Sequence, residues 1–208
     1  MKNFDKSIFS KKENTYLSAI FFLFGISIMS LAPRTPDLKA NLAINNGTFG
    51  TLLSAASIGS IIMLLIGGQS VHTIGAKKSF QIGSTVVAIT FIVLVHTKSP
   101  LIFLITNILA GAGISIHHIA TSGHSLHRQD EVGKVIVPKL HGAWGIGAMS
   151  TAAIAFAIST HVSIAWHITS LMICVWLLTQ YCIFRLSNSF PPKPDADDAY
   201  QLSSVKEI

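Results

Sequence analysis

Residues 48–69 read TFGTLLSAASIGSIIMLLIGGQ, a run of 22 residues without a charged side chain. A helix needs about 20 apolar residues to cross the hydrocarbon core of a bilayer, so this run is long enough to span a membrane. The sequence therefore predicts an all-α membrane protein, a bundle of six transmembrane helices. The other five apolar runs lie within residues 16–32, 80–95, 101–122, 140–160 and 164–184.

The composition agrees with a membrane location. Half of the residues are hydrophobic, only 12% are charged, and the mean hydropathy is +0.57. A soluble domain carries about 25% charged residues. There is no Asp or Glu between Leu38 and Gln129, and such a run cannot coat a water-exposed globule. The net charge of +6 does not indicate nucleic-acid binding, because the basic residues occur in short loops rather than in one patch. We expect a lipid bilayer as partner and no nucleic acid.

The basic residues are unevenly distributed between the two sides that six spans define. If the N-terminus is cytoplasmic, only Arg34, Lys39 and Lys98 lie outside, and twelve basic residues lie inside. This is the positive-inside bias of membrane proteins. We therefore expect a multi-pass protein of the plasma (inner) membrane with both termini in the cytoplasm. The inside residues are Lys2, Lys6, Lys11, Lys12, Lys77, Lys78, Arg128, Lys134, Lys139, Arg185, Lys193 and Lys206.

Three segments are predicted along the chain. Residues 1–15 form a polar cytoplasmic tail, residues 16–186 form the six-helix bundle, and residues 187–208 form a disordered cytoplasmic tail rich in proline and aspartate. Within the bundle we expect residues 124–139 to be the longest internal loop, because they are the most polar connection.

Signals for helix ends frame the second span. Pro33 and Pro36 mark the end of the first span, since proline breaks a helix. Asn46-Gly47 is a turn signal, and Thr48 is a plausible N-cap for the helix that follows.

The connection after the second span, residues 67–78, reads GGQSVHTIGAKK. It resembles the signature loop of the major facilitator superfamily, in which Gly-x-x-x-Asp-Arg-x-Gly precedes basic residues. Two further segments, residues 32–50 and 140–148, resemble the fucose-permease-like branch of that superfamily. The resemblance implies the N-terminal six-helix half of a transporter that moves a small polar solute by alternating access. It also implies a second six-helix unit as partner, either another copy or a separately encoded half.

The matched loop retains some of the family's residues and lacks others. Gly68 and Gly75 would let the helix ends pass closely and turn tightly, and Lys77 and Lys78 would anchor the third helix. The positions of the family's gate Asp and Arg hold His72 and Thr73, so the usual charge pairing cannot be made. An alternative function is therefore a six-helix membrane partner that does not transport, or the remnant of a split transporter gene.

Candidate solute or proton sites are few, because no span contains a carboxylate. His117 and His118 could line a central cavity, since histidine titrates near neutral pH, or they could be packing residues. Trp144 is a candidate for the same cavity or an interfacial anchor. Arg34 could attract an anion at the outer mouth or pair with Asp37. No motif indicates an enzyme, and we expect no metal or cofactor.

A ladder of small residues runs along the fifth span. Ala143, Gly147, Thr151 and Ala155 recur every four residues and form one smooth stripe. Such a stripe allows close approach of another helix in a membrane. We therefore predict that a helix packs along it.

Overall fold

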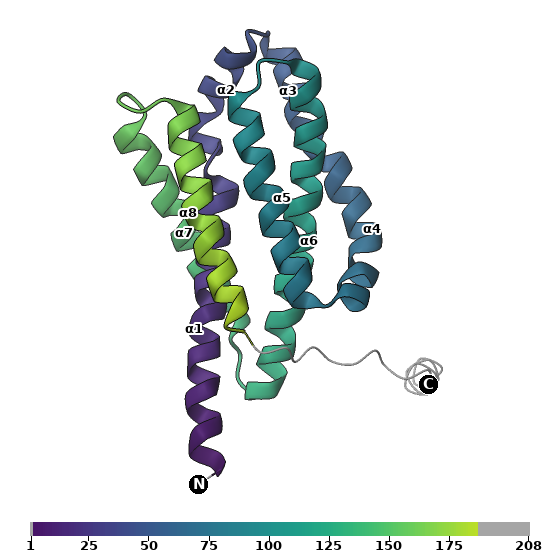
Figure 1. The fold of residues 1–208 in the computed structure, drawn as a ribbon, viewed down its shortest axis with the longest axis vertical. Coiled ribbons are helices and arrows are strands. Elements are labelled where there is room, and N and C mark those ends of the chain that lie inside the picture. The colour runs from purple at the N-terminus through teal and green to yellow at the C-terminus, as the bar shows by residue number, and fades with distance from the viewer. Residues whose placement is uncertain (1, 187–208) are drawn as a thin grey trace.

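The computed structural model describes residues 2–186, and the predicted C-terminal tail lies outside this range. The fold of these residues is all-helical (Figure 1). Six of its segments are long and apolar enough to cross a membrane, which confirms the predicted fold class. The elements are α1 (Lys2–Met29), the 3-10 turn η1 (Ala32–Arg34), α2 (Thr35–Leu42), α3 (Asn46–Ser54), α4 (Ala56–Ile74), α5 (Ala76–His96), α6 (Pro100–Val132), α7 (Val137–Ile158) and α8 (Ile164–Phe184).

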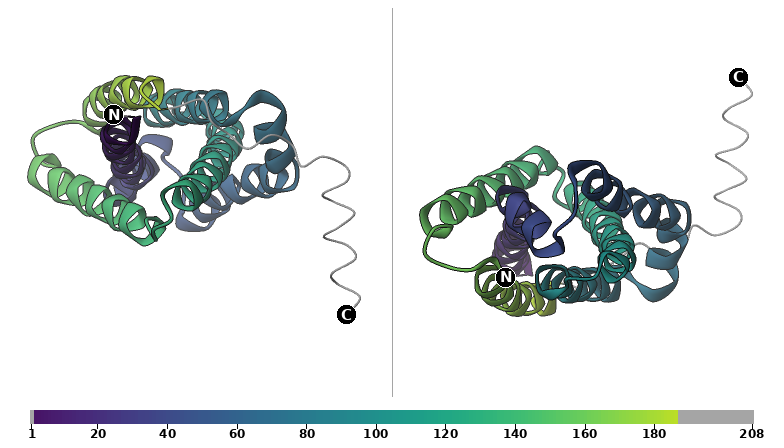
Figure 2. Two further views of the ribbon diagram at one scale, coloured as in Figure 1. Left: turned by 90° about the horizontal axis from the view of Figure 1, so that it is seen from below. Right: turned by 90° about the horizontal axis from the view of Figure 1, so that it is seen from above.

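The long helices form two groups of three. Helix α1 packs between α7 and α8, and α6 packs between α4 and α5, as the end views of Figure 2 show. Contacts between α5 and α8 join the two groups. The group of α4, α5 and α6 is one continuous piece of the sequence, whereas the other group joins the first helix to the last two.

Glycines bring the central helix of each group against a neighbour. Gly25 on α1 lies against the main-chain carbonyl of Trp144 on α7, and Gly147 lies in the same way against Phe22. The pair α4 and α6 repeats this arrangement. Gly59 on α4 lies against the carbonyl of Ile108 on α6, and Gly111 on α6 lies against the carbonyl of Ala56 on α4. A Cβ atom at any of these four glycines would overlap a main-chain carbonyl, so the close packing depends on glycine.

The predicted stripe on the fifth span faces α1. Gly147, Thr151 and Ala155 are buried, and Gly147 contacts α1 directly. The helix that packs along the stripe therefore belongs to the chain itself. The opposite side of α7 is open, with Ile146, Met149 and Phe156 exposed.

Polar side chains join α5 to α8. The Trp176 indole Nε1 donates a hydrogen bond to Thr85 Oγ1 at 2.9 Å, and Gln180 Nε2 donates to Ser84 Oγ at 3.0 Å. In an apolar medium such bonds satisfy groups that water cannot reach. The two groups of helices are therefore joined by directional contacts as well as by packing.

The second span is broken at Ala55, where α3 ends and α4 begins. Asn107 on α6 lies beside the break, is 8% exposed, and donates through Nδ2 to the carbonyls of Leu52 at 2.8 Å and Leu53 at 2.9 Å. A side-chain amide thus satisfies two carbonyls at the break, as a membrane interior requires. The N-cap of α3 is Asn45, whose side chain accepts from the Thr48 amide, so the prediction of Thr48 as N-cap is wrong.

The predicted loop over residues 124–139 is mostly helical, so that prediction is wrong. Helix α6 continues to Val132, stops at Gly133 in a left-handed conformation with φ 64°, and leaves only a short connection before α7. The extension is stabilised by Arg128, which contacts α1, as described below. The N-terminal segment is also helical, since α1 begins at Lys2 and runs without interruption into the first span.

Candidate solute-binding cavity

Helices α1, α6 and α7 line a partly open cavity of about 190 Å³, with His141 at its exposed edge. Its polar lining side chains are His118 on α6 and His141 and Trp144 on α7. The remaining lining residues are apolar: Phe21, Phe24, Ile28 and Ile114. Two imidazoles and an indole therefore face a space whose other walls offer only hydrocarbon and aromatic surface.

Each histidine of this cavity lies against an aromatic ring of α1. The ring of His118 stacks on Phe24, with centroids 6.3 Å apart and an interplanar angle of 22°. His141 meets Phe21 edge to face at 5.4 Å. Trp144 follows His141 by three residues, so the two share one face of α7. These ring contacts orient the imidazoles, because a stacked or edge-on ring restricts side-chain rotation.

His117 differs from its neighbour His118. It is 1% exposed and lies between Phe24 at 4.2 Å and Phe80 at 5.7 Å, measured between ring centroids. Its backbone and Cβ pack directly against Gly83 of α5. Both ring nitrogens are buried among these rings rather than turned toward the cavity. The structure thus separates the two candidates: His118 lines the cavity, and His117 is packed between α1 and α5.

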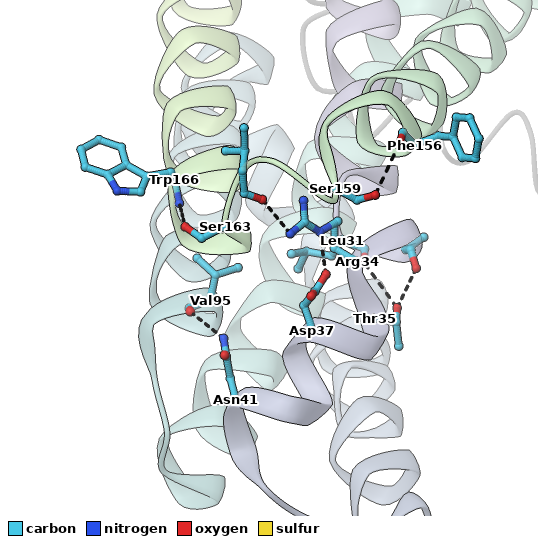
Figure 3. A network of polar contacts seen from close by, with 12 residues as sticks. Leu31, Arg34, Thr35, Asp37, Asn41, Val95, Phe156, Ser159, Ser163 and Trp166 are labelled. Atoms are coloured by element: carbon cyan, nitrogen blue, oxygen red, sulfur yellow. Dashed lines mark hydrogen bonds and ion pairs between the residues drawn. The ribbon is translucent and has the colours of Figure 1, made fainter.

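Arg34 does not line this cavity. It lies at the end of the bundle that carries η1 and the α7–α8 connection (Figure 3). Its Nε donates to Asp37 Oδ2 at 2.6 Å, and Nη2 donates to the carbonyl of Val162 at 3.1 Å. The guanidinium side chain is 2% exposed, whereas Asp37 is 46% exposed. Arg34 therefore ties η1 to the loop before α8, and a shallow hollow of about 340 Å³ opens beside this contact.

The loop resembling the family signature is mostly helix. Helix α4 continues to Ile74, so His72 and Thr73 occupy its last turn, exposed, with Thr73 Oγ1 donating to the Gln69 carbonyl. The turn itself is Gly75, with φ 87° and ψ 151°. This backbone conformation is open almost only to glycine, so the tight turn expected at Gly75 is present.

The expectation for Gly68 is wrong. A Cβ atom added there would meet nothing within 4 Å, so no helix approaches it closely. The close approach occurs one residue earlier, at Gly67, which is buried beside Ile119 of α6. Lys77 and Lys78 follow the turn in the first turn of α5, one half-buried and the other exposed.

A charged cluster joins α1 to the extended end of α6. Arg128 Nε donates to Asn14 Oδ1 at 3.1 Å, and Nη1 lies 3.4 Å from Glu13 Oε2 and 2.7 Å from Glu131 Oε2. The Arg128 and Glu13 side chains are 10% and 12% exposed. His124 lies 3.9 Å from Glu13. Sequence reasoning did not single out this cluster, because its members are over a hundred residues apart in the chain.

Sequence reasoning named only His118 and Trp144 among the residues that line the cavity, and it missed the polar residue His141 and the four apolar ones. His141 lies in a segment that resembles the family, and its spacing of three from Trp144 was an available signal. Phe24 carried no signal, because one phenylalanine among many apolar residues of a span cannot be distinguished by sequence alone.

The chain is similar to two curated transporters. It is 23% identical over 129 residues to an uncharacterized MFS-type transporter of Yersinia pestis, covering 62% of this chain and 34% of that protein. It is 26% identical over 164 residues to an uncharacterized transporter of Sinorhizobium fredii, covering 76% of this chain and 42% of that protein. The chain thus spans less than half the length of these relatives.

No protein-family profile matches the chain, and no solved structure matches it significantly. The similarity to the two curated transporters and the six apolar helices nevertheless agree with each other. Together they support a multi-pass membrane protein that resembles transporters of the major facilitator type.

Proposed function

We propose that this chain carries a small polar solute across the plasma membrane as one six-helix bundle of a major-facilitator-type transporter. The observation that supports this most directly is the cavity of His118, His141 and Trp144, because these residues gather at the meeting of three helices. In transporters of this kind, substrate sites lie near the midplane at the interface between structural repeats.

A second six-helix unit would complete the path. Helices α4 and α7 are the least covered of the six spans, and each presents a row of large exposed apolar side chains. Such faces suit either lipid or another helical unit. We propose that a second copy or a separately encoded bundle packs on the exposed faces of α4 and α7. Alternating access would then occur between the two units. The orientation proposed is with both termini in the cytoplasm.

Uptake into proteoliposomes tests the transport function. The purified chain, alone and co-purified with any bundle that associates with it, would be assayed against a panel of labelled small sugars, amino acids and organic acids. Uptake above that of empty liposomes, reduced by Trp144→Ala and unchanged by Trp166→Ala, is the expected result. Trp166 is the matched control because it is 74% exposed and lies outside the cavity. A correctly inserted protein that moves no member of the panel would support the non-transporting alternative.

The orientation has its own test. In a background without Cys174 and Cys182, single cysteines would replace Lys98 or Lys134, and intact cells would be treated with an impermeant maleimide. Labelling at position 98 and not at position 134 is expected. The reverse pattern would show that the positive-inside argument fails for this chain.

A further inference from the structure

The cavity between α1, α6 and α7 contains features that restrict the charge of its ligand. Its lining includes two histidines and no acidic side chain. Helices α5, α7 and α8 contain no Asp or Glu, and in α6 the acidic residues, Asp130 and Glu131, come only in its last turn. A cation entering this cavity would meet no opposite charge, and an unpaired charge in a membrane interior costs several kcal/mol.

The other charged and titratable groups near the cavity do not change this conclusion. On α6, His117 is packed between Phe24 and Phe80 and adds no negative charge. On α1, the lining residues are two phenylalanines and an isoleucine, and Glu13, two turns earlier, is engaged by Arg128. On α7, Lys139 precedes His141 by two residues and is exposed. The titratable groups that face the cavity are therefore the two imidazoles.

The same lining disfavours a ligand with many hydroxyl groups inside this cavity. The polar side chains available are His118, His141 and the Trp144 indole, whereas the remaining walls are rings and aliphatic groups. Each buried hydroxyl without a hydrogen-bond partner costs a few kcal/mol. An apolar body would instead pack on Phe21, Phe24 and the indole. One polar group at the histidine end and an apolar remainder fit the lining best.

From these observations we infer that the part of the solute held in this cavity is a small monoanion with an apolar body, bound as a carboxylate against the pair His118 and His141, which takes up one proton with it. The anion and the added proton neutralise each other, so the occupied cavity carries no uncompensated negative charge. This inference rests on the proposed function only in taking the cavity as the solute site. Its general chemical class is that of a hydrophobic monocarboxylate, which binds more tightly as the imidazoles become protonated.

Three probes of similar shape and different charge test the inference. Benzoate, benzamide and benzylamine would be titrated into the purified full chain in detergent, with quenching of Trp144 fluorescence as the readout. We expect benzoate to bind about tenfold or more tightly at about pH 6 than at about pH 8, because its binding is coupled to the uptake of one proton by the histidine pair. Benzamide should bind more weakly at about pH 6 with no pH dependence, and benzylamine should not bind. The quench should disappear in Trp144→Phe.

Variants at the two histidines complete the test. His118→Gln combined with His141→Gln should remove the pH dependence of benzoate binding, whereas His161→Gln, in the exposed α7–α8 connection, should retain it. Circular dichroism and thermal unfolding would verify that each variant is folded, and the single variants would be used if the double variant is not. Binding of benzylamine as tight as that of benzoate, absence of benzoate binding to the folded chain, or pH dependence that survives in folded histidine variants would overturn the inference.

The binding assay needs no translocation, so its outcome is independent of uptake. Benzoate binding without uptake of any solute would contradict the proposed transport function and would leave this inference in place. Uptake of a cation that competes for the Trp144 quench would overturn this inference and leave transport in place.

Discussion

Gly147 on α7 lies directly against the main-chain carbonyl of Phe22 on α1. The carbonyl belongs to a helix backbone and cannot rotate away, so a methyl group at position 147 would force the two helices apart. We expect Gly147→Ala to lower the free energy of unfolding by about 1–3 kcal/mol, the usual cost of overpacking. Unfolding in mixed detergent–SDS micelles measures this. Gly145→Ala is the matched control, because a Cβ there meets nothing within 4 Å. Equal effects of the two substitutions would contradict the close-packing argument.

Gly75 provides a second test, at the turn between α4 and α5. With φ 87° and ψ 151°, alanine at this position would be strained, and we expect Gly75→Ala to cost about 1–3 kcal/mol of unfolding free energy. Gly68→Ala, in the open part of the same motif, should be neutral or stabilising by up to about 1 kcal/mol, because alanine favours helix. The same SDS titration distinguishes them, and a neutral Gly75→Ala would show that the turn can adopt another backbone conformation.

Asn107 stabilises the broken second span from a neighbouring helix. Asn107→Leu removes the two hydrogen bonds that Nδ2 donates to the carbonyls of Leu52 and Leu53 at the break. We expect a loss of about 1 kcal/mol, the scale of interhelical hydrogen bonds in membrane proteins. Amide hydrogen exchange should also increase around the break at Ala55. As a control, Asn46→Leu alters an exposed asparagine in the first turn of α3. Unchanged exchange in Asn107→Leu would mean that water or a local rearrangement satisfies the carbonyls.

Arg128 couples the ends of α1 and α6. Arg128→Met would leave Glu13 in a mostly buried position without this cation, and breaking such a pair costs about 3 kcal/mol or more. Protease sensitivity of the α6–α7 connection should increase as the last turns of α6 lose their attachment to α1. Arg185→Met is a suitable control, because Arg185 is exposed at the end of α8, and we expect little change from it. Equal stability of both variants would show that the cluster adds nothing to helix docking.

Sequence reasoning could predict the six spans because each requires only a long apolar run. It failed for residues 124–139, where polar composition resembled a loop. The last turns of α6 are helical because Arg128 contacts Glu13 and Asn14 on α1, a contact that local composition cannot reveal. The turn at Gly75 was predictable from a local backbone requirement. The close approach assigned to Gly68 was not, because it depends on where the neighbouring helix lies.

The candidate site likewise has features that the sequence predicts and features that depend on the packing of neighbouring helices. His118 and His117 are adjacent, and sequence alone offers no reason to choose between them. Consecutive residues of a helix point about 100° apart, so the rotation of α6 about its axis decides which one lines the cavity. That rotation is set by contacts such as Gly83 against His117 and Gly111 against Ala56, which involve two other helices.

By itself, the sequence determined that this protein is an all-helical membrane protein with six spans and few internal charges. These properties follow from the hydrophobic effect acting on each segment separately. Only the tertiary structure decided that α1 packs between α7 and α8, that His118 rather than His117 meets His141 and Trp144, and that Glu13 meets Arg128. Each of these depends on helix positions and rotations, which arise from packing between segments far apart in the chain.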